Sequence, residues 1–464
     1  MNAFHWLASA LLCAAAPDPA APGESTWRQY ATPEDAGWSS ERLAAAWELA
    51  DQSGSAAVFG VFRGHALVAW GEVARRFECH SVRKSVVNAL VGQALAQGTL
   101  ALDATLEELE IDDLQPLTAE EQRARVVDLV RARSGVYHPA AKEPADMRAE
   151  RPARGSHAAG EFFFYNNWDF NLLGTLCERA AKTPFFEAFR DQIAVPLGME
   201  DFRVQDGFVE LAPSYSRYPA HAFRLSARDL ARFGQLYLQQ GTWNGRELIP
   251  PQWVADSTSP HTDLGGGRGY GYLWWTYAAG STAKYPRLNE FDCFAAIGTG
   301  GQFVLVVPKA EFVFVHRGDT DNEREVRGER VWSVAEALLA ARDGPPKEKP
   351  TLSELRVEPF TDPGPPKPEH APLALAPESY AGLLGEYAFE QGFTVRTFLH
   401  EGRLFVHRND GDEAELLPLS DSRFTLWFPA YEIEFERDAA GRAVSVALTT
   451  PKGRLNGRRI DAAK

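Results

Sequence analysis

The stretch SVRKSVVNALVGQALAQG, residues 81–98, decides how the rest of this chain is interpreted. Its apolar side chains recur at helical spacing and Gly98 gives a natural end, so the pattern predicts a helix over 81–97. Ser81 then lies at the start of the helix, with Lys84 one turn later on the same face. A neutral lysine amine can take the proton of a serine hydroxyl, and both burial and the helix dipole favour the neutral form. The alternative interpretation is a serine N-cap followed by a solvated lysine.

A second segment has the same Ser-x-x-Lys pattern, so the pattern alone is not decisive. Ser281-Thr282-Ala283-Lys284 follows Gly280, and Pro286 comes two residues after the lysine. No apolar helical repeat follows this segment. We therefore expect a loop here.

Length and composition limit the function classes. With 464 residues the chain is long enough for more than one domain, and 45% apolar and 24% charged residues are typical of soluble globular proteins. The 48 basic and 63 acidic residues give a net charge of -15 with no basic cluster, which argues against nucleic acid as a partner. No apolar run reaches the length of a transmembrane span. The four cysteines, at positions 13, 79, 177 and 293, form no CxxC pair and favour no metal site.

The first residues resemble a secretory signal. Trp6 to Ala16 is short, apolar and ends in small residues, which predicts a signal peptide over 1–16 with cleavage near Ala14 or Ala16. The segment before it has no Lys or Arg. We therefore expect an exported protein, periplasmic or secreted. A cytoplasmic location is the alternative if this segment is not a signal.

Residues 27–342 are expected to form one α+β unit. A hairpin is expected early, with strands at 58–63 and 66–70 separated by Gly64-His65. The expected helices are 81–97, 122–133, 168–181, 183–193 and 226–239, and the expected late strands are 302–307 and 311–317. Strands at both ends and helices between them imply an antiparallel sheet flanked by helices, with a helical subdomain.

The C-terminal part has a different composition. Residues 343–377 are rich in proline and mixed charge and are expected to form an extended linker. Residues 378–464 are expected to form a small all-β, barrel-like antiparallel domain, because short alternating segments are separated by turn residues. These segments are 393–398, 403–406, 424–427 and 432–435.

A second motif follows 84 residues after Ser81, in the segment FFFYNNW (162–168). Tyr165-x-Asn167 can supply a proton shuttle and an amide that holds a substrate carbonyl or orients the lysine. A nearby lysine is expected to lower the pKa of the tyrosine by stabilising the phenolate. The alternative is an aromatic turn that caps the following helix.

The third motif is glycine-rich. Gly298-Thr299-Gly300-Gly301-Gln302 leads into the strand 303–307. Glycines allow the backbone to approach a ligand closely, and an edge strand can present an N–H to a developing oxyanion. A plain tight hairpin is the alternative.

Together these motifs resemble the serine β-lactamase and penicillin-binding-protein superfamily, on the branch of class C β-lactamases and related esterases and amidases. Ser81-x-x-Lys84, Tyr165-x-Asn167 and the glycine-rich strand occur in the order and at the separations typical of that superfamily. The resemblance covers roughly 27–342. Supporting segments are 133–136 (RSGV), 224–234 (RLSARDLARFG), 244–250 (NGRELIP) and 269–275 (GYGYLWW).

The resemblance implies a serine hydrolase that cleaves a small-molecule ester, amide or peptide-like bond through an acyl-enzyme on Ser81. Lys84 and Tyr165 are then the proton-transfer groups, and the backbone N–H groups of Ser81 and Thr299, beside Gly298, form the oxyanion hole. Asn167 positions the substrate and the lysine. The resemblance implies neither a metal nor an organic cofactor, and it leaves the oligomeric state open.

The third motif departs from penicillin-recognising members. These usually carry Lys-Thr-Gly where this chain has Ala296-Ile297-Gly298, so the cation that pairs with a substrate carboxylate is missing. The Gly-x-Gly-Gly-Gln form is similar to esterase-like and 6-aminohexanoate-oligomer hydrolase-like members. The alternatives are a penicillin-binding DD-peptidase, a β-lactamase, or a catalytically silent ligand-binding member.

Overall fold

The structure is a computed structural model that describes residues 26–360, 373–409, 411, 413–426, 431–450 and 452–460. The predicted signal segment, residues 1–16, lies outside the described residues.

Within residues 26–360, ten strands form one sheet in the order β10-β11-β12-β13-β14-β15-β2-β3-β1-β16. Every neighbouring pair is antiparallel except β1 and β3, which pair in parallel. The strands are β1 (Arg28–Tyr30), β2 (Ala57–Phe62), β3 (His65–Gly71), β10 (Thr262–Asp263), β11 (Arg268–Tyr270), β12 (Trp275–Tyr277), β13 (Cys293–Gly298), β14 (Gln302–Val307), β15 (Phe312–Arg317) and β16 (Leu352–Glu354).

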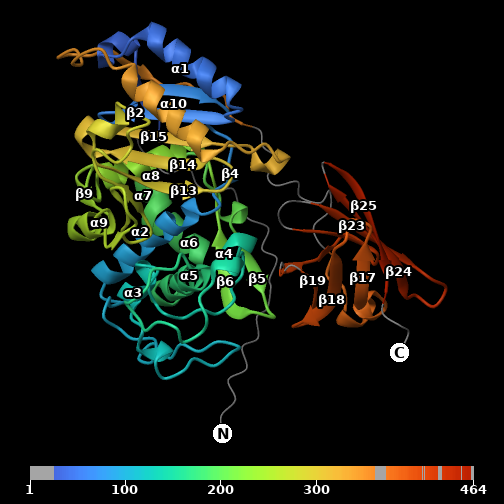
Figure 1. Ribbon diagram of the computed structural model, residues 1–464. Helices are drawn as coiled ribbons and strands as arrows, with labels where there is room; N and C mark the ends of the chain where they lie inside the picture. The colour runs from blue at the N-terminus through green and yellow to red at the C-terminus, as the bar shows by residue number, and fades with distance from the viewer. Residues whose placement is uncertain are drawn as a thin grey trace.

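Helices cover both faces of this sheet because the central strands are apolar on both faces. Along β14 and β15, Phe303, Leu305 and Phe314 pack with α1 (Ser40–Gln52) and α10 (Gly328–Ala340). The alternate residues, such as Val304 and Val313, pack on the other face with α2 (Val82–Ala96) and α8 (Ala227–Leu238). Figure 1 shows α1 and α10 together on one side of the sheet.

A helical subdomain adjoins the α2 side of the sheet (Figure 1). Its helices are α3 (Val126–Val130), α4 (Ala145–Glu150), α5 (Asn167–Ala181), α6 (Phe185–Phe189), α7 (Val195–Leu197) and α9 (Pro251–Ser257). Three two-stranded ribbons complete the unit: β4 (Phe77–Glu78) with β7 (Arg224–Leu225), β5 (Phe208–Ala212) with β6 (Ser216–Ala222), and β8 (Thr242–Trp243) with β9 (Arg246–Glu247).

In the described part of residues 373–460, nine strands form an antiparallel, barrel-like sheet in the order β20-β19-β18-β17-β25-β24-β23-β22-β21. Its core includes Tyr387, Leu404 and Phe435. The strands are β17 (Gly385–Phe389), β18 (Thr394–His400), β19 (Arg403–Arg408), β20 (Glu413–Glu415), β21 (Leu417–Pro418), β22 (Arg423–Thr425), β23 (Glu432–Arg437), β24 (Ala443–Thr450) and β25 (Gly453–Arg459). The α+β fold followed by a small barrel-like β domain is therefore as expected.

The C-terminal sheet contacts the β5–β6 hairpin. The backbone N–H of Ser214 donates to Glu413 at 3.0 Å, and the Tyr215 hydroxyl lies 3.4 Å from Nε2 of His407. Figure 1 shows this sheet, in red and orange, beside β5. The contact brings β20 to the same side of the molecule as α4.

Two sequence expectations differ from the structure in their boundaries. The early hairpin turns at Arg63-Gly64 rather than Gly64-His65, since both of these residues adopt positive φ (48° and 79°). The strand β16 lies within residues 343–377, which were expected to be an extended linker, and it pairs with β1.

Two expected helices also have other limits. The helix expected at 122–133 is interrupted, because extended Arg125 starts α3 and its backbone N–H donates to Asp128. The helix expected at 183–193 begins after Pro184, which is extended, and continues through a π-helix, Arg190–Ala194, into α7.

Of the helices in the described residues, none is both long and apolar enough to cross a membrane.

Candidate active site

Ser81 and Lys84 are hydrogen bonded at the start of α2. Ser81 occupies the N-cap position, but its hydroxyl makes no capping hydrogen bond. Lys84 Nζ lies 2.8 Å from Ser81 Oγ, and the lysine is only 3% exposed. The alternative of a capping serine with a solvated lysine is therefore wrong.

Burial sets the protonation state of Lys84. It lowers the pKa of the amine well below the ordinary 10.5, and the cations of Arg83 and Lys142 lower that pKa further. The amine also faces the aromatic rings of Tyr165 and Phe170, whose centroids are 4.5 Å and 5.1 Å away. A neutral amine in contact with a hydroxyl is the arrangement that a general base requires.

Tyr165 meets the same hydroxyl. Burial is the largest effect on its pKa and raises it to about 12, although a hydrogen bond with Ser81 and the charge of Arg83 act in the opposite direction. The expected lowering of this pKa by the neighbouring lysine is therefore wrong, because burial outweighs the groups that lower the pKa and Lys84 is not one of those groups. The phenol is held by ring contacts with Phe170 and Trp275, at centroid distances of 4.9 Å and 5.4 Å.

Asn167 is the first residue of α5, two positions after Tyr165, and lines the same cavity. The preceding residue, Asn166, caps α5 by accepting a hydrogen bond from the N–H of Trp168 at 3.1 Å. Asn167 Nδ2 donates to the carbonyl of Lys142, while its Oδ1 is buried with no partner among the described residues. Both interpretations of this segment therefore hold: it caps α5, and it places Tyr165 and Asn167 in the wall of a cavity.

The end of β13 lies against the start of α2. A Cβ atom on Gly298 would lie 2.6 Å from the carbonyl oxygen of Cys79 and 3.1 Å from the backbone nitrogen of Ser81. Only a residue without a side chain fits there. In the described part of the chain, the backbone N–H groups of Ser81 and Thr299 have no hydrogen-bond partner. Both residues line the cavity, so both groups are open to a ligand.

The segment before Ser81 is fixed by a buried arginine that the sequence motifs do not include. Arg317, on β15, donates to the carbonyls of Phe77 and Glu78 at 2.8 Å and 2.9 Å. Its own Nε donates to Gln302 at 2.7 Å. The central strands therefore hold the nucleophile segment in place through one guanidinium group.

His80 precedes Ser81 with a positive φ of 46°. Burial, and then the charge of Lys142, lowers its pKa to about 3. Its Nε2 lies 3.0 Å from Thr320 Oγ1. A histidine with so low a pKa is a poor acceptor for a proton near neutral pH.

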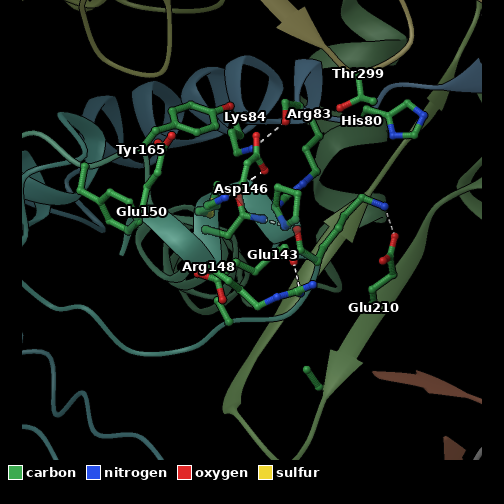
Figure 2. Close-up of a pocket in the computed structure, with 18 of the residues that line it drawn as sticks. His80, Arg83, Lys84, Glu143, Asp146, Arg148, Glu150, Tyr165, Glu210 and Thr299 are labelled. Atoms are coloured by element: carbon green, nitrogen blue, oxygen red, sulfur yellow. Dashed lines mark hydrogen bonds and ion pairs between the residues drawn. The ribbon is translucent and has the colours of Figure 1, made fainter. Parts of the chain in front are cut away.

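Two adjoining cavities share Ser81, Tyr165 and Thr299 in their walls. The larger cavity has a volume of about 980 Å³ and extends beneath α4 toward β5 and β20. The smaller cavity, about 500 Å³, runs along β13 to the start of α10. Figure 2 shows Lys84, Tyr165 and Thr299 with α4 residues Asp146 and Glu150 around the larger cavity.

Several lining residues have no sequence signal that would identify them. Lys142 bridges the carboxylates of Glu78 and Glu210. Burial lowers the pKa of Lys142, but these two carboxylates outweigh burial and raise it overall. Gly411 and Glu413 of the C-terminal sheet also line the larger cavity. These contacts join segments far apart in the chain, and no motif records them.

The second Ser-x-x-Lys segment lies apart from these cavities. Residues 281–284 form a bend and turn, as expected, and Lys284 pairs with Glu329 on the surface. Among the aromatic residues singled out from the sequence, Trp168, Tyr270 and Trp274 are core residues, whereas Phe162 and Trp275 line the larger cavity. His221 is buried against Phe185 and lines neither cavity.

Within the described residues, no group of three or more His, Cys, Asp or Glu side chains is placed to hold a metal ion.

Comparison with known proteins gives a family. No curated protein matches the chain. Similar solved structures include the octameric penicillin-binding protein homologue from Pyrococcus abyssi, with 16% identity, a TM-score of 0.48, and coverage of 90% of this chain and 99% of that chain. They also include the hydrolase EstCE1, which has promiscuous acyltransferase activity, with 18% identity, a TM-score of 0.48, and coverage of 67% and 99%. The penicillin-binding protein from Bacillus halodurans matches with 16% identity, a TM-score of 0.47, and coverage of 63% and 98%.

The assignment itself rests on a family model rather than on these structures. The model described as Beta-lactamase matches residues 50–355, which is more than half of the chain. The matched range contains all three motifs and the walls of both cavities, apart from residues 411, 413 and 414 of the larger one. The chain therefore belongs to the β-lactamase family.

Proposed function

We propose that this protein is a serine hydrolase that cleaves an ester or amide bond through an acyl-enzyme on Ser81. The observation that carries the proposal is the 2.8 Å contact between Ser81 Oγ and the buried amine of Lys84. Since the pKa of Lys84 lies well below its ordinary value, the amine is available to accept the serine proton.

The proposed reaction divides the proton transfers between two groups. Ser81 Oγ forms a bond to the substrate carbonyl carbon while Lys84 takes its proton. The tetrahedral intermediate then expels an alcohol or amine, which receives a proton through the protonated phenol of Tyr165. Water attacks the acyl-enzyme in the second half, with the same groups in reverse order, and releases the acid.

The developing oxyanion is assigned to the N–H groups of Ser81 and Thr299. Support comes from the fact that neither N–H group has a hydrogen-bond partner among the described residues, and from the close approach of Gly298 to Ser81. Two aligned backbone donors are a common way to stabilise a tetrahedral intermediate.

The assignment favours esters and amides over β-lactams. Ala296 stands where penicillin-recognising members carry a lysine, and its neighbour Ile297 lines the smaller cavity. The charge that would bind a β-lactam carboxylate is therefore absent from this strand position.

A fluorophosphonate probe tests the proposal directly. We expect the probe to form an adduct on the peptide that contains Ser81, identified by mass spectrometry after proteolysis, and no adduct on Ser281. Absence of an adduct on Ser81 would favour a ligand-binding protein without catalysis. Labelling of Ser81 by fluorescent penicillin at comparable rates would instead favour a DD-peptidase or β-lactamase.

Substitution Gly298→Ala is expected to lower kcat for a p-nitrophenyl ester by about 100-fold, the order of losing one oxyanion donor. The added Cβ meets backbone atoms of Cys79 and Ser81, so the end of β13 must move away from the nucleophile. The matched control is Gly344→Ala, where no atom lies within 4 Å of the added Cβ. Unchanged kcat in Gly298→Ala, with the fold intact by circular dichroism, would contradict the role given to this strand end.

A further inference from the structure

Arg83 is a buried cation next to the proposed base. It is 1% exposed, it precedes Lys84 in the first turn of α2, and both residues line the larger cavity. Figure 2 shows both side chains on α2 among the residues around this cavity. Burial lowers the pKa of Arg83, but an arginine guanidinium stays charged in proteins. A permanent positive charge therefore lies beside the amine that has to accept the serine proton.

No ion pair offsets the charge of Arg83 within the described residues. Its Nη2 donates to Oδ1 of Asn171, a neutral acceptor, at 2.8 Å. Its Nη1 is buried and has no hydrogen-bond partner among these residues. The acidic side chains whose charge reaches Arg83 are those of Glu78 and Glu210, and both are paired with Lys142.

Packing does not account for a charged residue at this position. A buried charge without a carboxylate partner is unfavourable for the folded state. Arg83 is also the second residue of α2, and the first turn of this helix contains no acidic residue. The helix dipole disfavours a cation there. A residue that is unfavourable in both respects and lines the cavity beside the proposed base points to a role in the reaction.

The charged groups that act on Lys84 come from two segments. On its own helix Lys84 meets the hydroxyl of Ser81 and the charge of Arg83. The loop before α4 contributes Lys142, but this amine lies between two carboxylates, one from β4 and one from β5. The segment before α5 contributes Tyr165, whose ring centroid is 4.5 Å from the lysine nitrogen.

The other titratable groups near this site are neutral. Burial raises the pKa of Tyr165 to about 12, and it raises the pKa of Tyr270 on β11, which contacts the Tyr165 ring at a centroid distance of 6.0 Å, well above the ordinary value. Burial is also the largest effect on His80 and lowers its pKa to about 3. Among the described groups named here, Arg83 is thus the cation that no carboxylate pairs with.

We propose that Arg83 is a positioning residue for this reaction, because its unpaired charge keeps the adjacent Lys84 amine free of a proton, ready to accept the proton of Ser81. The inference rests on the proposed function, since Arg83 acts through the base of that reaction and not on the substrate. The direction agrees with the titration of the amine: burial is the largest effect that lowers the pKa of Lys84, and the charge of Arg83 is the next.

Three variants separate the charge of Arg83 from its hydrogen bond. Arg83→Gln removes the charge and keeps an N–H donor for Asn171. Asn171→Asp keeps Arg83 and supplies the carboxylate that it lacks. Asn171→Ala is the matched control for the aspartate variant. Both substitutions at this position remove the amide that donates to the carbonyl of Ala141 at 3.0 Å, but only aspartate adds a charge.

The first measurement is the pH dependence of kcat/KM for p-nitrophenyl butyrate. In Arg83→Gln and in Asn171→Asp, we expect the midpoint of the rise with pH to move upward by at least about one pH unit. Turnover then falls about tenfold below the wild-type midpoint and recovers to within about threefold of the wild type at alkaline pH. The midpoint of Asn171→Ala is expected to stay within about 0.3 pH unit of the wild type.

The second measurement follows the Lys84 amine without any need for turnover. The full-length protein is labelled with ¹³C at the ε-carbon of lysine, and the chemical shift of Lys84 is titrated by NMR. The Lys84 signal is identified by its loss in Lys84→Met. We expect the same upward shift of its midpoint in Arg83→Gln and in Asn171→Asp, and no shift in Asn171→Ala.

The outcomes distinguish this inference from the proposed function. An unchanged Lys84 midpoint in Arg83→Gln or in Asn171→Asp, folded by circular dichroism, overturns the inference even when turnover requires Ser81. If Arg83→Gln does not fold, Asn171→Asp decides alone. A shift in Asn171→Ala as large as that in Asn171→Asp assigns the effect to a lost hydrogen bond and also overturns it. If the Lys84 midpoint shifts as expected but Ser81→Ala keeps full turnover, the effect of Arg83 on Lys84 stands and the proposed function fails.

Discussion

Replacing Ser81 by alanine is expected to reduce the hydrolysis of p-nitrophenyl butyrate by more than about 1,000-fold, because the substitution removes the hydroxyl that is proposed to form the acyl-enzyme. The substitution removes one oxygen atom at the N-cap of α2, and that oxygen makes no capping hydrogen bond. The helix therefore loses little when it is removed. Steady-state kinetics with purified protein, together with a thermal melt, separate loss of chemistry from loss of fold.

The second Ser-x-x-Lys segment provides the matched control for this prediction. Ser281 stands in the same sequence pattern but lies in a bend that lines neither cavity. Ser281→Ala is expected to retain wild-type turnover. Equal activity of the Ser81→Ala variant and the wild type would show that hydrolysis uses another group, and the acyl-enzyme mechanism would have to be abandoned.

The sequence predicted those helices and strands whose limits depend only on residues close to one another in the chain. The helix at 81–97 corresponds to α2, and the strand at 302–307 corresponds to β14 with the same limits. In both segments the period of the apolar residues matches the local geometry. The relation of Ser81 to Lys84 is also local, since it spans one helical turn.

The parts that the sequence could not predict depend on contacts between distant segments. Arg317 is an ordinary charged residue at the end of a predicted strand, yet in the fold it anchors the backbone of residues 77 and 78. The wall formed by α4 and β20 requires two domains to meet across more than 260 residues of sequence. Neither hydrophobic periodicity nor turn residues indicate a contact between segments so far apart in the sequence, so this wall is seen only in the folded structure.

The effect of burial on the titrating groups was predicted for one residue and missed for the other. Lys84 follows a helical pattern that is apolar on several sides, so a lowered pKa was expected. The pKa of Tyr165 was expected to be lowered by a nearby cation, but burial is the largest effect and raises it to about 12. For two neighbouring titratable groups such as Lys84 and Tyr165, the direction of each pKa shift can be predicted only when the burial of both groups is known.

Replacing Lys84 by methionine is expected to reduce ester hydrolysis by about 1,000-fold and also to stabilise the fold at neutral pH. Methionine keeps the length and apolar stem of the side chain but cannot accept the proton of Ser81. In the wild type, kcat/KM should rise with pH as Lys84 loses its proton. No fall due to Tyr165 is expected up to pH 10, because its pKa is about 12.

The stabilising effect follows from the lowered pKa of the buried amine. The unfolded chain binds a proton on Lys84 up to its ordinary pKa of 10.5, whereas the folded protein releases that proton at a lower pH. Between these two values the unfolded state binds more protons, so wild-type stability rises with pH. The methionine variant has no such proton to bind. Its melting temperature should exceed that of the wild type most at low pH, and the difference should shrink as the pH approaches 10.5.

Lys284→Met is the matched control, because Lys284 is exposed and its amine pairs with Glu329 on the surface. This variant should keep wild-type turnover and show no gain in stability that depends on pH in the same way. A difference in melting temperature between Lys84→Met and the wild type that stays constant from pH 6 to pH 10 would mean that Lys84 titrates alike in the folded and unfolded states. The amine would then be charged at neutral pH and unable to act as the base for Ser81, whatever the distance between the two groups.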